Sequence, residues 1–167
     1  EAPYLVSRYD VSTGELIVPP LRRIGILDRK LRVVNENTDT YEEWLKWTIR
    51  AFEASYGYEY QGDNVLIARI NMLLTFTDYY EERWDKQPDD KLLQQMANKI
   101  VWNIWQMDGL KDTVPLGKPY EEYRQMTLFE MLGDTQSDDA DEPEAVPCRI
   151  FNWRSKTSMK FMKLKEM

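Results

Sequence analysis

The chain has 167 residues, of which 43% are hydrophobic and 13% aromatic, and these values exclude a disordered polypeptide. Its formal net charge is −7, but seven of the 29 acidic residues lie in residues 130–147, where no basic residue occurs. The rest of the chain therefore carries 22 acidic and 22 basic residues. This balance argues against a charged mimic of DNA and against a strongly basic DNA-binding body.

Histidine is absent and Cys148 is the only cysteine. This excludes a His-dependent catalytic triad, histidine metal ligands, an internal disulfide and a cysteine metal cluster within the chain. No apolar run is long enough to span a membrane, and the N-terminus lacks a secretory signal pattern, so we expect a cytoplasmic protein with no membrane partner. The start at Glu1, without methionine, favours a piece of a longer protein.

The N-terminal part predicts a β-hairpin. Residues 4–9 and 15–18 flank a Gly-containing turn at 10–14, and the following Pro19–Pro20 pair is expected to end the hairpin. Residues 23–28 fit either a short strand or the start of a helix, because periodicity does not separate these two possibilities in so short a run.

The first of three tryptophan-rich helices is predicted over residues 41–56, with Thr38 or Asp39 as its N-cap. Apolar residues recur at helical spacing along it. We therefore expect one face to pack against the rest of the domain.

The second helix is predicted over residues 65–85, with Asp63 or Asn64 as its N-cap. Its first half is apolar nearly all round, which predicts central burial. Its second half carries acidic and basic residues, so we expect this half to emerge into water.

The third helix is predicted from Pro88, which is tolerated at a helix start, to a C-terminal cap at Gly109. Five of the six tryptophans lie on the three helices, and we expect them to supply most of the core. Residues 119–132 predict a weaker fourth helix.

The fold class is therefore α+β and mainly α, with three tryptophan-rich helices packed with N-terminal and C-terminal β-hairpins. We expect a helical body over residues 1–132, an acidic flexible linker over 133–147, and a hairpin over 148–167 that packs back on the body. The two strands of this hairpin are predicted at 148–153 and 158–164.

Glu59 is the one candidate cofactor residue. It ends a strand-like run before a helix, where nucleoside-binding α/β folds place an acid that accepts hydrogen bonds from ribose hydroxyls. A glycine-rich turn should precede this element, but the possible strand at 26–28 is followed by Arg29 and Lys30 instead. The sequence favours the alternative, an exposed acid beside a helix start.

The C-terminal hairpin carries the only basic patch, formed by Arg149, Arg154, Lys156, Lys160, Lys163 and Lys165. These side chains are candidate contacts to DNA phosphates. The alternative, which the sequence favours, is a set of lysines that protect strand edges against association with other strands.

Several polar and aromatic residues beside the helices also have two interpretations. The polar ones are Asn71, Asn98, Asn103, Gln106 and Asp108. They fit a hydrogen-bonded network between helices better than a surface that reads base edges, because they have no basic surroundings. Trp102 and Trp105 fit the core better than a platform for an extruded base.

Five segments resemble the distal part of adenine-specific DNA methyltransferases of restriction–modification systems, described as restriction endonuclease subunit M. They are Arg23-Ile-Gly-Ile-Leu-Asp-Arg-Lys, Tyr58-Glu-Tyr-Gln-Gly-Asp-Asn, the Ala68-Arg-x-Asn helix, Asn103-Ile-Trp-Gln-Met-Asp-Gly-Leu and Asn152-Trp-Arg. The resemblance implies a parent enzyme that transfers a methyl group from S-adenosylmethionine to adenine in DNA.

The catalytic signature of that family is Asp/Asn/Ser-Pro-Pro-Tyr/Phe, which holds the adenine amino group and stacks on the flipped base. Neither Pro19-Pro-Leu nor Gly117-Lys-Pro-Tyr fits it, so no catalytic residue is assigned. We therefore expect a non-catalytic accessory region whose partner is the catalytic domain, with DNA, a restriction nuclease or a specificity subunit as further partners. The alternative is a stand-alone interaction protein of a phage or mobile element that acts on a restriction system.

Overall fold

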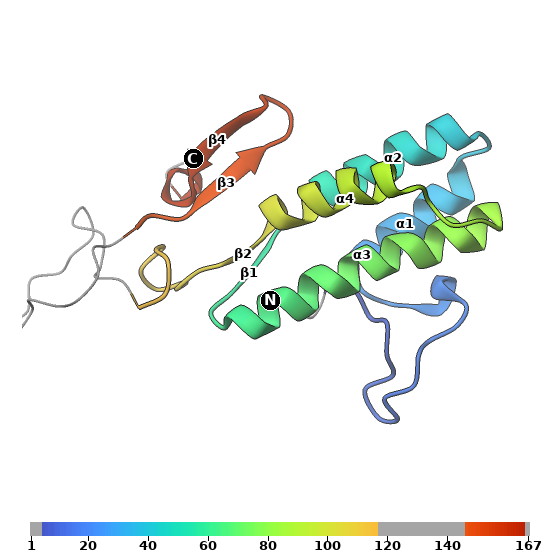
Figure 1. Cartoon of the computed structure of the whole chain (residues 1–167), viewed down its shortest axis with the longest axis horizontal. Helices are drawn as coiled ribbons and strands as arrows, with labels where there is room; N and C mark the ends of the chain where they lie inside the picture. The colour runs from blue at the N-terminus through green and yellow to red at the C-terminus, as the bar shows by residue number, and fades with distance from the viewer. Residues whose placement is uncertain (1–4, 117–145, 166–167) are drawn as a thin grey trace, which may run out of the picture. The chain divides into compact units, whose positions relative to one another are not determined.

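The computed structural model describes residues 5–116 and 146–165, and the chain divides into two compact units, Glu1–Trp105 (unit 1) and Gln106–Met167 (unit 2). Both helices and strands are present and helices predominate, as the sequence predicts (Figure 1). In chain order the elements are η2 (Pro20–Arg22), α1 (Ile26–Asn37), α2 (Tyr41–Glu53), β1 (Gly57–Glu59), α3 (Gly62–Trp84), α4 (Asp90–Asn103), β2 (Ile104–Gln106), β3 (Arg149–Asn152), β4 (Thr157–Lys160) and η5 (Phe161–Leu164).

The predicted N-terminal hairpin forms as a turn without extended strands. The Asp10 carboxylate accepts hydrogen bonds from the amides of Ser12 and Thr13, and the only strand-like contact of this turn is the bridge between Tyr9 and Leu16. Pairing stops there because the preceding residues contact helices instead: Leu5 is buried, and its carbonyl accepts a hydrogen bond from the Leu27 amide at 2.7 Å.

The ambiguous segment before residue 28 is the start of helix α1, and the alternative of a strand is wrong. Gly25 occupies its N-cap, and a Cβ atom there would lie only 2.6 Å from Val6 Cα and 2.5 Å from a carboxylate oxygen of Asp28. A glycine is therefore needed for the N-terminal segment to approach the helix this closely. Leu27 and Leu31 form its buried face.

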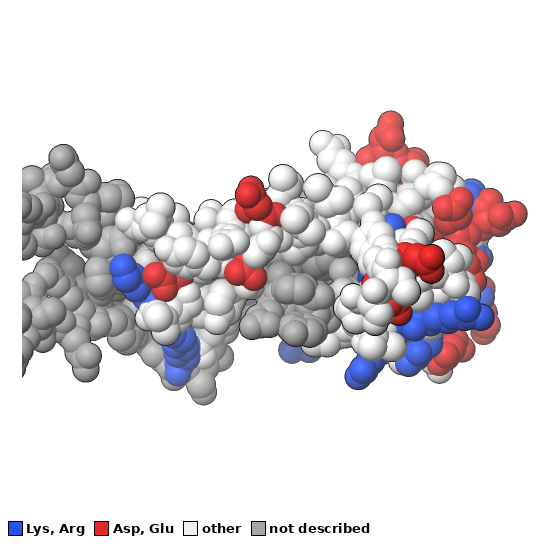
Figure 2. Space-filling model, turned by 90° about the horizontal axis from the view of Figure 1, so that it is seen from below, with Lys and Arg blue, Asp and Glu red and all other residues white. Residues whose placement is uncertain are grey.

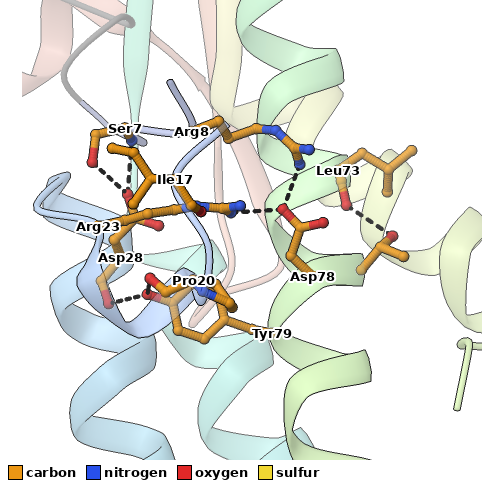
Figure 3. A network of polar contacts seen from close by, with 10 residues as sticks. Ser7, Arg8, Ile17, Pro20, Arg23, Asp28, Leu73, Asp78 and Tyr79 are labelled. Atoms are coloured by element: carbon orange, nitrogen blue, oxygen red, sulfur yellow. Dashed lines mark hydrogen bonds and ion pairs between the residues drawn. The ribbon is translucent and has the colours of Figure 1, made fainter. Parts of the chain in front are cut away.

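Buried arginines attach the N-terminal segment to α3 (Figure 3). Arg23 donates a hydrogen bond from Nη1 to Asp78 Oδ2 at 2.6 Å, and Arg8 Nη1 forms an ion pair with the same oxygen at 2.7 Å. Arg23 also donates from Nε to the Ile17 carbonyl. Because charges removed from water are costly unless they are paired, this cluster requires the segment and α3 to come together.

Asp28 provides a second polar attachment in the same region. It is fully buried, and its Oδ2 accepts a hydrogen bond from the Ser7 amide at 2.7 Å. The Tyr79 hydroxyl of α3 lies within hydrogen-bonding distance of two backbone carbonyl oxygens, those of Pro20 and Asp28. Burial raises the pKa of the Asp28 carboxyl despite the opposing hydrogen bonds from Ser7 and the charge of Arg23.

Helix α2 is capped by Thr40, whose hydroxyl accepts a hydrogen bond from the Glu43 amide, so the predicted caps Thr38 and Asp39 are wrong. Thr38 is buried and instead donates its hydroxyl hydrogen to the Val34 carbonyl at the end of α1. The buried face of α2 consists of Trp44, Thr48, Ala51 and Phe52.

Helix α3 begins at Gly62, earlier than expected, so the predicted caps Asp63 and Asn64 lie in its first turn. Its pattern of burial also differs from the prediction. Tyr79 and Tyr80 of the charged second half are buried, whereas the apolar first half is buried on one side, which includes Met72 and Phe76, and keeps a large exposed face on the other. A helix that is apolar on all sides can be buried on all sides, but other elements of unit 1 cover only one side of this half.

Helix α4 begins at Asp90, two residues after the predicted start at Pro88, because Asp89 is its N-cap and accepts a hydrogen bond from the Leu92 amide at 2.7 Å. It ends at Asn103 rather than near Gly109, because the chain extends into β2 and pairs with β1. Arg69 of α3 donates to the carbonyls of Val101 and Ile104 and so satisfies backbone acceptors at this helix end.

The tryptophans contribute less to the core than expected. Trp44 is fully buried and lies 5.9 Å from Trp84, ring centroid to ring centroid. Trp47 and Trp102 are 44% and 38% exposed, and Trp105 lies in β2 rather than in a helix. The rest of the aromatic core comes from Phe52, Phe76, Tyr79 and Tyr80.

Unit 2 contains the predicted C-terminal hairpin. Strands β3 and β4 pair antiparallel with Arg149 opposite Lys160, Ile150 opposite Met159, Phe151 opposite Ser158 and Asn152 opposite Thr157. The second strand is shorter than predicted, because the chain turns into η5 at Phe161. Thr113 forms antiparallel β-bridges with Asp108 and with Pro147. These bridges connect the segment after β2 to the segment before β3.

The predicted helix at 119–132, most of the predicted linker at 133–147 and the boundary between body and linker lie outside the described residues. Residues 106–116 group with the hairpin in unit 2. Among the helices of the described residues, none has the length and apolar character needed to cross a membrane.

Candidate functional site

Strand alternation gives the C-terminal hairpin two different faces. Cys148 and Ile150 are buried, and they point to the side of β3 that faces the interior of unit 2. Arg149 and Phe151 alternate with them and therefore point to the opposite side. Trp153 lies in the turn after β3, with its ring beside that of Phe151. The register adds Ser158 and Lys160 of β4 to that side. We call the surface formed by Arg149, Phe151, Trp153, Ser158 and Lys160 the open hairpin face.

The open hairpin face combines rings and cations. The ring centroids of Phe151 and Trp153 are 4.6 Å apart with the planes tilted by 59°. Arg149 donates from Nη2 to the hydroxyl of Ser158 at 2.8 Å, which orients the guanidinium without neutralising its charge. Lys160 lies directly opposite Arg149 in the register.

The structure separates the six predicted DNA-binding residues into three groups. Arg149 and Lys160 belong to the open hairpin face. Arg154 and Lys156 are exposed in the turn between the strands, where the Asn152 side chain accepts hydrogen bonds from the next amides. Lys163 and Lys165 lie in and after η5. The six cations therefore lie in three parts of unit 2, and their contact with DNA stays a prediction.

Lys165 is engaged in an ion pair with Asp112. The two atoms are 2.6 Å apart, and Asp112 is nearly buried while Lys165 is largely exposed. Burial and, to a lesser degree, the charge of Asp112 raise the pKa of the Cys148 thiol to about 11. Cys148 is buried and its thiol is protonated at neutral pH, as expected for a cysteine that packs in the interior of unit 2.

Glu59 lies at the end of β1, immediately before α3, as predicted. Its Oε1 accepts a hydrogen bond from the Tyr60 amide at 2.9 Å. Strand β1 leads into α3 and pairs with β2, which follows α4 (Figure 1). The segment at 26–28 that was considered as the preceding strand is helical, so the strand–turn–helix cofactor element is not formed there.

The exposed apolar face of α3 was missed by sequence reasoning, which expected these residues in the core. Four side chains spaced along one side of the helix are exposed: Leu66 (57%), Ile67 (56%), Ile70 (48%) and Leu74 (39%). In the view from below (Figure 2), the surface near the start of α3 is mostly uncharged. Most of the charged side chains of unit 1 lie near the end of α3. A contiguous apolar patch of this kind typically marks an interaction surface.

Asn103 fits the predicted hydrogen-bonded network between helices, whereas Asn98 and Gln106 are exposed. The side chain of Asn103 is buried, and Nδ2 donates to the carbonyls of Phe52 and Ser55 at 2.8 and 3.1 Å. It therefore connects the end of α4 to the end of α2. Asp108 also has a structural role: its carboxylate stabilises a local turn by accepting hydrogen bonds from the amides of Leu110 and Lys111.

No group of three or more Asp, Glu or Cys residues suited to a metal ion occurs within residues 5–116 and 146–165. The two surfaces that stand out are the apolar face of α3 in unit 1 and the open hairpin face in unit 2. No protein-family model, curated protein or solved structure matches this chain.

Proposed function

We propose that this chain is a non-catalytic accessory domain of a restriction–modification adenine methyltransferase, and that it docks on the catalytic domain through the apolar face of α3. The observation that carries the proposal is the exposure of Leu66, Ile67, Ile70 and Leu74 on one side of that helix. The resemblance of five sequence segments to the distal part of such enzymes supports the choice of partner. Parent enzyme and domain would act in the cytoplasm.

The apolar face has the chemistry of a docking surface for another protein. Full burial of one leucine or isoleucine side chain stabilises a complex by about 1.5–3 kcal/mol. Each of the four residues is already 39–57% exposed, so a partner would gain roughly half of that value from each. A small cluster of such anchors is the usual energetic centre of a protein–protein interface.

Catalysis is assigned to the parent enzyme because the chain lacks the Pro-Pro-aromatic signature and has no histidine. S-Adenosylmethionine is accordingly a cofactor of the parent. Glu59 remains the one proposed contact to it, as an acceptor for ribose hydroxyls at the end of β1. Calorimetric titration of the chain with S-adenosylmethionine tests this separate point, and the absence of binding heat and of thermal stabilisation would remove Glu59 from the proposal.

The docking proposal is tested by measuring the affinity of the chain for the purified catalytic domain of a related methyltransferase. The variant Ile67→Ser/Ile70→Ser should weaken binding by at least about tenfold, because two central apolar anchors are lost. The matched control is Val11→Ser/Val33→Ser, which alters two exposed valines elsewhere in unit 1 and should leave binding unchanged. Equal binding by the wild type and the α3 variant would contradict the proposal.

The second candidate is a stand-alone interaction protein of a phage or mobile element that acts on a restriction system. The acidic run in residues 130–147 favours this candidate, because such a run can engage a basic partner surface. The same binding assay separates the two candidates. Tight binding to a restriction nuclease or specificity subunit, without binding to the catalytic domain, would favour the stand-alone protein.

A further inference from the structure

The exposed apolar surface of α3 continues onto α4. The two helices contact each other and run side by side (Figure 1). Arg69 of α3 donates hydrogen bonds to the carbonyls of Val101 and Ile104, so the start of α3 lies beside the end of α4. Val101 is 49% exposed there. We call the surface formed by Leu66, Ile70, Leu74 and Val101 the α3–α4 outer face.

The spacing of these side chains matches that of another helix. The three α3 residues of the outer face recur every four positions and therefore form one ridge along α3. On α4, Val101 shares its side of the helix with Ala97 and Leu93, which are partly buried. Ridges with this spacing pack into the grooves between the side chains of a second helix. The outer face therefore has the pattern expected of a surface that receives a helix.

Exposed carboxylates lie at both ends of the outer face. Asp63 is in the first turn of α3, and Glu81 lies about five turns later on the same side of that helix. Asp90 begins α4 and lies about three turns before Val101 on the same side. In the described part of the chain, none of these three carboxylates forms an ion pair. Their negative charge is therefore available to a cationic partner.

This charge pattern decides between possible occupants. A second copy of this chain would place its own acidic ends against those of the first, and a nucleic acid or an anionic membrane would also be repelled. A helix with an apolar centre and a cationic residue at each end complements the face in both charge and spacing. Arg69 does not offset the acids, because its guanidinium donates to the carbonyls of α4.

We infer that the α3–α4 outer face receives one amphipathic α-helix of the partner, with lysine or arginine at both ends of an apolar centre. The inference rests on the proposed function, since it specifies the part of the catalytic domain that docks on α3. The stretch from Asp63 to Glu81 measures about 27 Å along the helix axis, so a partner helix of about 18 residues would span it.

The test uses the full chain and two labelled helical peptides of about 18 residues with the same apolar ridge. One peptide carries lysines at both ends, and the other carries glutamates at the same positions. Fluorescence anisotropy should show that the lysine peptide binds at least about tenfold more tightly, because several exposed charge pairs each contribute a small gain. The preference should decrease as salt is added, because salt screens charges at the surface.

A charge-reversal variant tests the acidic ends. Asp63→Lys/Glu81→Lys should reverse the preference, so that the glutamate peptide binds more tightly than the lysine peptide. The matched control is Glu36→Lys/Glu42→Lys, which reverses two exposed carboxylates on α1 and α2 and should keep the preference of the wild type. Circular dichroism should show that both variants fold.

A second variant tests the contribution of α4. Val101→Ser should weaken binding of the lysine peptide by about threefold, because a half-exposed valine loses its contact with the peptide. The matched control Val33→Ser alters an exposed valine of α1 and should leave the affinity unchanged.

Three results would overturn the inference: equal binding of the two peptides by the wild type, an unchanged preference in the Asp63/Glu81 variant, and self-association of the chain that Val101→Ser abolishes. The peptides test the helix without the catalytic domain, so the two proposals fail separately. Binding of the lysine peptide without binding of the catalytic domain would support the helix and contradict the proposed function. Binding of the catalytic domain through α3 that does not depend on the acidic ends would support the proposed function and contradict the helix.

Discussion

The two units are stabilised in different ways. Unit 1 buries a large apolar core around Trp44 and Phe76, together with an arginine–carboxylate cluster at Asp78. The buried apolar residues of unit 2 within the described part are few: Met107, Cys148, Ile150 and Met162. Unit 2 depends more on strand pairing, on the bridges of Thr113 and on one ion pair. We therefore expect that removing a buried side chain of a given size lowers the free energy of unfolding much more in unit 1 than in unit 2.

The largest effect is expected from Trp44→Ala in unit 1. Trp44 is fully buried, packs against Phe76, Tyr80 and Trp84, and donates a hydrogen bond from its indole nitrogen to Asn35. Removing this ring should lower the free energy of unfolding by about 3–5 kcal/mol, measured by urea denaturation with helical circular dichroism. The control Trp47→Ala removes a 44% exposed ring and should cost less than about 1 kcal/mol. Similar losses in both variants would contradict this account of the core.

A smaller, pH-dependent effect is expected from the polar attachment of unit 1. Burial raises the pKa of Asp28, so its contribution to stability is present below the ordinary carboxyl pKa and is lost as pH rises through the raised value. The free energy of unfolding of the wild type, relative to Asp28→Asn, should therefore fall as pH rises from about 4. Urea denaturation of both proteins between acidic and neutral pH measures the difference.

Asp10→Asn provides a control of opposite sign for this pH experiment. The amides of Ser12 and Thr13 lower the pKa of Asp10, so its contribution is present above the ordinary pKa and is lost as pH falls. The wild type relative to Asp10→Asn should thus gain stability with rising pH. The same sign for both aspartates would show that the environment of Asp28 has been misassigned.

The smallest effect is expected from Lys165→Ala in unit 2. Lys165 is 57% exposed, and exposed ion pairs contribute about 1 kcal/mol or less. Native-state labelling of the buried Cys148 thiol reports the opening of unit 2, and its rate should rise about threefold. Lys163→Ala, which alters a neighbouring exposed lysine, should leave the rate unchanged. An unaltered rate in the Lys165 variant would mean that the ion pair does not stabilise the unit.

Several elements were predictable because their signals are local. Helix α4 begins within two residues of its predicted start at Pro88, and the alternation of β3 gives the hairpin its position. Both signals depend on residues within a few positions of each other. Other caps were misplaced, as Thr40 and Gln61 show, because neighbouring polar residues offer equivalent local signals.

The amino-acid sequence by itself determined the mainly helical α+β class, the C-terminal hairpin and the clustering of cations within it. Only the tertiary structure decided that α3 keeps an apolar face exposed, that Asn103 joins α4 to α2, and that Lys165 is paired while Arg149 faces Lys160. The physical reason is that periodicity defines the faces of a helix or strand, but contacts between segments far apart in the chain decide which face is covered.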